Sequence, residues 1–277
     1  MRIDRLQLVL AALVLAALVG CGSGGYREDP LLALSSEEAL VQGKALMEEG
    51  KYREAEEYLN HAFQVEPNSP GGREALLLAA DALFLAGGEQ NYIRAEGKYR
   101  DFQNRFPTAA RGDYVLFQVA RSLHERMLKP DRDQEAARKA LSAYQEVVTL
   151  FPTSEYAEEA RLGILEVRAN LAESEFLVGR FYSRLGLPKA AIARFETLLD
   201  QYPEYPQADR ALLLLGKAQV KMEKNDEALA TFDRLRAEFP DSGYLEDIPR
   251  VEKEKPLAEP AEGDPAPETE VAEESPA

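Results

Sequence analysis

The 277-residue sequence contains no tryptophan, a single cysteine (Cys21) and only two histidines, His61 and His124. One cysteine cannot form a disulfide within the chain, and neither histidine has a further cysteine or histidine nearby to complete a metal site. Motifs of the H-E-x-x-H, G-x-S-x-G and phosphate-loop types are missing as well. We therefore expect no metal, no cofactor and no enzymatic activity, and we interpret both histidines as core or surface residues.

Positive charge is also scarce, because 33 lysines and arginines stand against 49 aspartates and glutamates, for a formal net charge of −16. A protein this acidic is a poor candidate for binding the nucleic-acid backbone or an anionic lipid surface. Residues 248–277, here called the acidic tail, include the phrase "KPLAEPAEGDPAPETEVAEESPA", which has no aromatic residue and is rich in Pro, Glu and Ala. This composition predicts a disordered tail, with a docking function as the alternative.

Long apolar runs are absent except near the N-terminus, where Leu6 to Val19 is interrupted only by Gln7. The run follows Arg2 and Arg5 and is shorter than the roughly 20 residues that a helix needs to cross a bilayer core. Charged residues, then a short apolar run, then small residues are typical of a secretory signal peptide. We assign residues 1–20 to such a signal.

The only cysteine follows this segment directly, in Leu18-Val19-Gly20-Cys21. These four residues resemble the lipobox of bacterial lipoproteins, in which the thiolate of the cysteine accepts a diacylglyceryl group. The resemblance implies that Cys21 is lipidated, becomes the first residue of the mature chain and begins a linker over residues 21–34. In such lipoproteins an aspartate directly after the cysteine retains the protein at the inner membrane. This chain has Gly22 at that position, which favours transfer to the outer membrane. The alternative is a buried or incidental thiol.

Proline recurs in a regular pattern through the middle of the chain. Five prolines each follow an alanine by twelve residues, and a large side chain stands four residues after each alanine: Ala55, Leu59 and Pro67; Ala95, Tyr99 and Pro107; Ala140, Tyr144 and Pro152; Ala191, Phe195 and Pro203; Ala228, Phe232 and Pro240. Residues i and i+4 share one helix face, where the small one admits a neighbouring helix and the large one fills the adjoining space. The proline ends the helix.

This pattern is the second half of a tetratricopeptide repeat (TPR). Gly43, Gly179 and Gly216 stand at the helix crossing of repeats one, four and five, whereas Leu83 and Leu128 take that place in repeats two and three and predict longer linkers there. The wide spacing in repeat four predicts a long first helix from about 154 to 185. The fold we expect is an all-α superhelical solenoid of five repeats, within residues 35–247, at about 35–68, 69–108, 109–153, 154–204 and 205–241.

Two longer phrases are more specific than the repeats: "RDFQNRFPTAARGDYVLFQVARS", with the insertion "PDRDQEAARKALSAYQEVVTLFPTSEYAEEA", and "LAESEFLVGRFYSRLGLPKAAIARFETLLDQYP". With the lipobox, they make the chain similar to the BamD family of lipoproteins, which belong to the β-barrel assembly machinery of the outer membrane. The resemblance covers about Ser35 to Tyr244. It implies a lipid-anchored outer-membrane scaffold that faces the periplasm, docks on the POTRA modules of the barrel-forming subunit and assists unfolded outer-membrane proteins.

The resemblance also implies roles for individual residues. Arg194 matches a family arginine that pairs with an acidic residue of the barrel-forming subunit, although it could equally be an ordinary surface arginine. Tyr52, Tyr58, Tyr92 and Tyr99 are candidates for binding the C-terminal strand of an unfolded outer-membrane protein, because tyrosine offers apolar area and a hydroxyl at low entropic cost. A structural role is the alternative, above all for Tyr99 at its packing position and Tyr52 in a turn.

Two alternatives come from other functional classes, and the second is disfavoured. A TPR lipoprotein could instead serve a pilus or secretin complex, or coordinate peptidoglycan synthesis. An enzyme such as a periplasmic helical muramidase would need a separate catalytic domain, for which the chain has no room.

Overall fold

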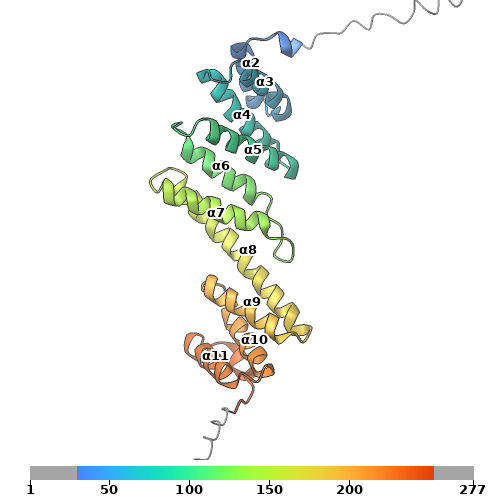
Figure 1. Ribbon diagram of the computed structural model, residues 1–277, viewed down its shortest axis with the longest axis vertical. Helices are drawn as coiled ribbons and strands as arrows, with labels where there is room; N and C mark the ends of the chain where they lie inside the picture. Colours follow the sequence, from blue (N-terminus) through green and yellow to red (C-terminus); the bar gives the residue numbers. More distant parts are fainter. Residues whose placement is uncertain (1–29, 253–277) are drawn as a thin grey trace, which may run out of the picture. The chain divides into compact units, whose positions relative to one another are not determined.

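The computed structural model describes residues 30–252, and these residues form ten α-helices, two short 3-10 helices and no strand (Figure 1). The expected all-α TPR fold is therefore confirmed. The assigned signal peptide, Cys21 with most of its linker, and the acidic tail beyond Glu252 lie outside the described residues. Within residues 30–252, no helix is both long and apolar enough to span a membrane.

The helices form five consecutive pairs. The first helices of the pairs are α2 (Ser36–Glu48), α4 (Pro70–Ala86), α6 (Gly112–His124), α8 (Ala157–Arg184) and α10 (Ala208–Lys221). The second helices are α3 (Tyr52–Val65), α5 (Glu89–Arg105), α7 (Glu135–Leu150), α9 (Pro188–Gln201) and α11 (Asn225–Glu238). The short helices are η1 (Pro30–Ala33) and η2 (Gly243–Asp247).

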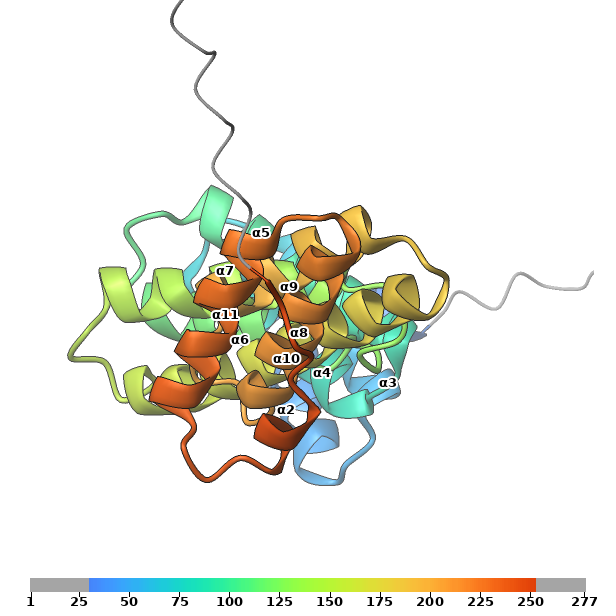
Figure 2. The ribbon, with the colours of Figure 1, turned by 90° about the horizontal axis from the view of Figure 1, so that it is seen from below.

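The described chain forms two compact units. Unit 1 consists of residues 30–127 and 135–167, and unit 2 consists of residues 128–134 and 168–252. In unit 1 each helix from α2 to α7 packs against the next, and in unit 2 α10 packs against α9, α11 and η2 (Figures 1 and 2). The loop 128–134 belongs to unit 2 because it contacts α8, where Asn170 Nδ2 donates to the carbonyl of Leu128 at 2.8 Å.

The repeated prolines end helices as the sequence predicts. Helix α9, for example, ends at Gln201, and Tyr202 follows with φ −131° and ψ 62° directly before Pro203. The proline ring excludes the helical conformation for the residue before it, so the chain turns at this point. Helices α3, α5 and α11 end in the same way, two residues before Pro67, Pro107 and Pro240.

The alanine and large residues of the repeat meet at the helix crossings. All five alanines are 0% exposed, and the large residues four positions later are at most 3% exposed. A Cβ atom added to Gly43 would lie 2.7 Å from Leu59, and one added to Gly179 would lie 2.6 Å from Phe195. Because such distances are too short for a carbon contact, these crossings require glycine.

The linkers match expectation in repeat three and differ in repeat two. In repeat three, residues 125–134 separate α6 from α7, and Leu128 lies in this loop. In repeat two the prediction of a longer linker was wrong, because only Gly87 and Gly88, both with positive φ, separate α4 from α5. The additional residues lengthen the helices instead, to 17 residues each, and Leu83 is buried inside α4. The expected long helix of repeat four is α8, with 28 residues.

Candidate partner-binding surfaces

One of the four candidate tyrosines belongs to the core. Tyr99 is 0% exposed, and its hydroxyl donates to Asp81 Oδ1 at 2.7 Å. The hydroxyl of Tyr114, on α6, donates to the same oxygen at 2.7 Å. Tyr99 thus joins α5 to α4 and has no surface for a ligand, so its expected role in peptide binding was wrong. Burial raises the pKa of Asp81, although the two hydroxyls and Arg111 oppose this effect.

The other three tyrosines are partly exposed, and two of them lie beside the C-terminal end of α4. Tyr52 begins α3 and lines a shallow hollow of about 300 Å³ together with Ala86. The ring of Tyr92 lies 5.5 Å from that of Phe84, measured between centroids. Tyr52 and Tyr58 both pack against the core formed by α2, α3 and α4. The structure thus brings Tyr52 and Tyr92 near one helix end, and both Tyr52 and Tyr58 have a packing role as well.

Apolar side chains are exposed at the same helix end. Leu85 in α4 and Ile93 in α5 are 51% and 47% exposed. Together with Tyr52 and Tyr92 they form what we call the α4–α5 surface. Exposed aliphatic side chains and tyrosines near one helix end suit contact with an apolar peptide whose backbone needs hydrogen-bond partners. Sequence reasoning singled out only the tyrosines, because single exposed leucines or isoleucines are common on protein surfaces.

A polar network near this surface joins α3 to α5. The carboxylate of Glu56, which is nearly buried, accepts two hydrogen bonds from Arg94 Nη2, at 2.6 and 2.8 Å. Asn60 donates to Glu56 Oε1 at 2.7 Å and accepts from Lys98. Burial lowers the pKa of Lys98, and the nearby Glu56 carboxylate raises it. Sequence reasoning missed this network, whose only signal is that Glu56 and Arg94 flank the repeat alanines of consecutive helix pairs.

The candidate docking residue Arg194 lies on α9, and its side chain is 45% exposed. Its guanidinium forms an ion pair with Glu175 on α8, with 3.2 Å between Nη1 and Oε2. This distance is long for a charge-assisted hydrogen bond, and a pair that stays in contact with solvent, with Glu175 20% exposed, contributes little to stability. The guanidinium can therefore change partners at small cost.

Both histidines contact polar groups of neighbouring residues. His61 is 8% exposed, and its Nε2 lies 2.9 Å from the carbonyl oxygen of Leu34. His124 Nδ1 lies 3.1 Å from the hydroxyl of Tyr144. In residues 30–252, no three His, Cys, Asp or Glu side chains are grouped so that they could hold a metal ion.

Comparison with known protein families shows to which family this chain belongs. Residues 33–230, which include helices from both units, match the family model YfiO, described as "Outer membrane lipoprotein". The chain belongs to the YfiO family. The match extends from η1 to α11, so all five helix pairs lie within it or overlap it.

Similar proteins of known name agree with the family. The chain is 29% identical to the "Outer membrane protein assembly factor BamD" of Caulobacter vibrioides, over 88% of this chain and 79% of that protein. It is also 29% identical to the protein of the same name from Rickettsia prowazekii, over 87% of this chain and 94% of that protein. Among solved structures it is similar to the TPR2AB-domain:pHSP90 complex of yeast Sti1, with 16% identity, a TM-score of 0.39 and coverage of 75% and 78%.

Proposed function

We propose that this protein is an outer-membrane protein assembly factor: a non-enzymatic scaffold, anchored by lipid at Cys21, that faces the periplasm within the β-barrel assembly complex. The observation that carries the proposal is the YfiO family match over residues 33–230, together with relatives named for this role. The helix-pair architecture supports it, because repeats of this type bind other proteins on extended surfaces.

The direct test is purification of the full-length, tagged protein from detergent-solubilised outer membranes of its own cells, followed by identification of the main co-purifying protein. We expect a barrel-forming outer-membrane protein that carries POTRA modules. A secretin or a pilus-assembly protein as the main partner would refute the proposal and favour another envelope complex.

For docking, we propose that Arg194 exchanges Glu175 for an acidic residue of the barrel-forming subunit. Truncation of one side of a desolvated interfacial ion pair costs about 2–5 kcal/mol, which corresponds to at least about a 30-fold loss of affinity. Arg194→Glu should therefore greatly reduce co-purification of the subunit at moderate salt while the far-UV circular dichroism spectrum stays unchanged.

Two matched variants make this test specific. Arg234 has the same side-chain exposure, 45%, and is also paired within the chain, to Glu238. Arg234→Glu changes the net charge equally and should leave co-purification intact. Glu175→Gln frees the Arg194 guanidinium and should preserve or increase co-purification. Equal recovery of the subunit with Arg194→Glu and Arg234→Glu would return Arg194 to the class of ordinary surface arginines.

For substrate recognition, we propose that the α4–α5 surface captures the extended C-terminal strand of an unfolded outer-membrane protein, with Tyr52 and Tyr92 as contacts. Tyr58, which is partly exposed, is a third candidate contact. An unpaired apolar strand needs such cover, because its free backbone groups and side chains otherwise promote aggregation.

Photo-crosslinking tests this substrate surface. Probes in place of Leu85 or Ile93 should react with a synthetic peptide that copies such a C-terminus and ends in Phe. Probes in place of Leu162 and Leu165 are matched controls, since these side chains lie in the part of α8 that belongs to unit 1 and are 60% and 58% exposed. A terminal Phe→Ala change should weaken the reaction. Equal yields at all four positions, or with both peptides, would contradict the proposal.

A further inference from the structure

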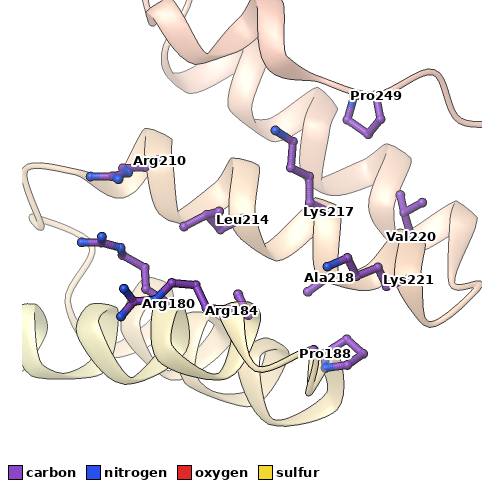
Figure 3. Close-up of a pocket in the computed structure, with 12 residues that line it drawn as sticks. Arg180, Arg184, Pro188, Arg210, Leu214, Lys217, Ala218, Val220, Lys221 and Pro249 are labelled. Carbon is purple, nitrogen blue, oxygen red and sulfur yellow. The ribbon is translucent and has the colours of Figure 1, made fainter.

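Unit 2 contains a groove of about 610 Å³ with an unusual charge for so acidic a protein. Five cationic residues line it, Arg180 and Arg184 from α8 and Arg210, Lys217 and Lys221 from α10, and no acidic residue lines it (Figure 3). Leu214 contributes an apolar wall between the cations. We call this site the basic groove.

The cations of the basic groove are free to bind an anion. Within residues 30–252, none of the five forms an ion pair, whereas Lys44, Lys139, Lys224, Arg234 and Arg236 each pair with an acidic side chain. Arg184 and Lys221 lie in the last turns of their helices, where the helix dipole by itself favours a cation. That explanation does not extend to Arg180, Arg210 and Lys217, so the concentration of charge has a cause beyond helix stability.

Packing holds part of this charge in place. The guanidinium groups of Arg180 and Arg210 each lie 5.5 Å from the ring centroid of Phe176, which is 0% exposed. Stacking on an aromatic face limits the rotamers of both arginines before any ligand arrives. The hydroxyl oxygen of Ser183, which also lines the groove, is buried and has no hydrogen-bond partner among the described residues. Arginines in fixed positions and an unused donor are suited to carboxylates.

The acidic tail starts at this groove. Pro249 lines the groove, and in Figures 2 and 3 the last described segment runs over α10. Beyond Glu252 the sequence carries eight acidic residues and two lysines over residues 253–277, with five prolines that disfavour helix and strand. A binding segment tethered next to its site has an effective concentration on the order of millimolar, so even weak contacts are populated.

We propose that the basic groove binds the chain's own acidic tail, as an extended segment whose carboxylates pair with Arg180, Arg210 and Lys217. The tail is then an intramolecular competitor: an acidic segment of any partner reaches the groove only after it displaces the tail. This inference is independent of the proposed function, because it depends only on the groove and on the charge of residues 253–277.

The experiment uses the full chain with a benzophenone amino acid in place of Val271, and mass spectrometry locates the intramolecular cross-links. We expect them on α10 and on the C-terminal half of α8. The combined variant Lys217→Glu and Lys221→Glu should lower their yield by about tenfold, since attraction becomes repulsion at two positions. Raising the salt from 0.05 to 0.5 M should lower the yield too, as expected for charges that are partly exposed.

Two further variants keep the test decisive if charge reversal disturbs the groove itself. Arg234→Glu with Arg236→Glu makes the same change in net charge on α11 and should leave the yield unchanged. Glutamine in place of Glu268, Glu270, Glu273 and Glu274 alters only the tail and should lower the yield as groove reversal does. Cross-links on α2 to α7, cross-links between two copies of the chain, or a yield indifferent to groove reversal would overturn the proposal. Loss of an acidic co-purifying protein on groove reversal, with the tail cross-links unaltered, would assign the groove to a partner instead.

Discussion

A single added methyl group at the crossing of α10 and α11 tests the packing of the TPR fold. A Cβ atom on Gly216 would lie 2.6 Å from Cζ of Phe232, whose ring is 0% exposed and cannot swing into solvent. Overpacking of this kind costs typically about 1–3 kcal/mol, and the close approach to several ring atoms favours the upper end. Alanine regains about 1 kcal/mol of helix propensity relative to glycine. Gly216→Ala should therefore lower the free energy of unfolding by about 2 kcal/mol.

Gly97 offers a matched control. It lies inside α5, is exposed and has nothing within 4 Å of the position that a Cβ would take. Gly97→Ala should raise stability by about 0.5–1 kcal/mol, because only the propensity gain applies. Denaturant unfolding followed by circular dichroism compares the two variants, and amide hydrogen exchange shows whether the loss is confined to α10 and α11. Equal stabilisation by both substitutions would refute the close crossing of these helices.

Three further predictions concern buried polar groups and the anchor. Asp81→Asn should keep an acceptor for its two tyrosine donors and retain stability at pH 7, whereas Asp81→Ala strands both hydroxyls and should cost about 2–4 kcal/mol in thermal or urea unfolding. Burial raises the pKa of Asp81, so the folded state holds the carboxyl proton to higher pH than the unfolded state does. Asp81 therefore contributes most to the free energy of unfolding below its ordinary pKa, and this contribution is lost as the pH rises through the raised pKa. Asp81→Asn should remove this pH-dependent loss of stability from a profile of unfolding free energy against pH. Arg94→Ala leaves the nearly buried Glu56 carboxylate without its cation and should cost about 1–2 kcal/mol in the same unfolding assay, against about 0.3–0.5 for the exposed helix pair lost in Arg234→Ala. Under the proposed lipid anchor, Cys21→Ala should leave an uncleaved or soluble protein on cell fractionation, because the acyl chains would supply the affinity for the outer membrane; normal recovery in the outer membrane without its partner would contradict this.

The repeats could be predicted from sequence because their signal is local. Ala191, Phe195 and Pro203 stand at offsets set by one helix and its end, and these offsets do not depend on what the helix contacts. The crossing residue depends also on the loop between the helices. In repeat three the offset of twelve therefore points to Leu128, which lies in a long loop and not on α6.

The binding surfaces could be predicted less well, because they depend on which helices meet. The repeat pattern gives Tyr99 a packing position but leaves a ligand-binding role open, and its contact with Asp81 on another helix identifies it as a core residue. The basic groove combines charges from α8 and α10, about thirty positions apart. A weak signal was present, since Arg180 and Arg184, like Lys217 and Lys221, are like-charged pairs at i, i+4 that an isolated helix disfavours.

The loop 128–134 has a consequence for the order in which the chain acquires its structure. Because the ribosome synthesises a chain from its N-terminus, this loop is made before the part of α8 that holds it. The Leu128 carbonyl can therefore accept its hydrogen bond only after Asn170 has been added to the chain. Meanwhile Gln134 organises the loop from within, donating through Nε2 to the carbonyls of Lys129 and Arg132 at 2.8 and 3.1 Å. Neither unit is one continuous stretch of polypeptide, and no single cut divides the gene into two pieces that each encode a whole unit. Neither unit can therefore be produced whole as one uninterrupted fragment of this chain.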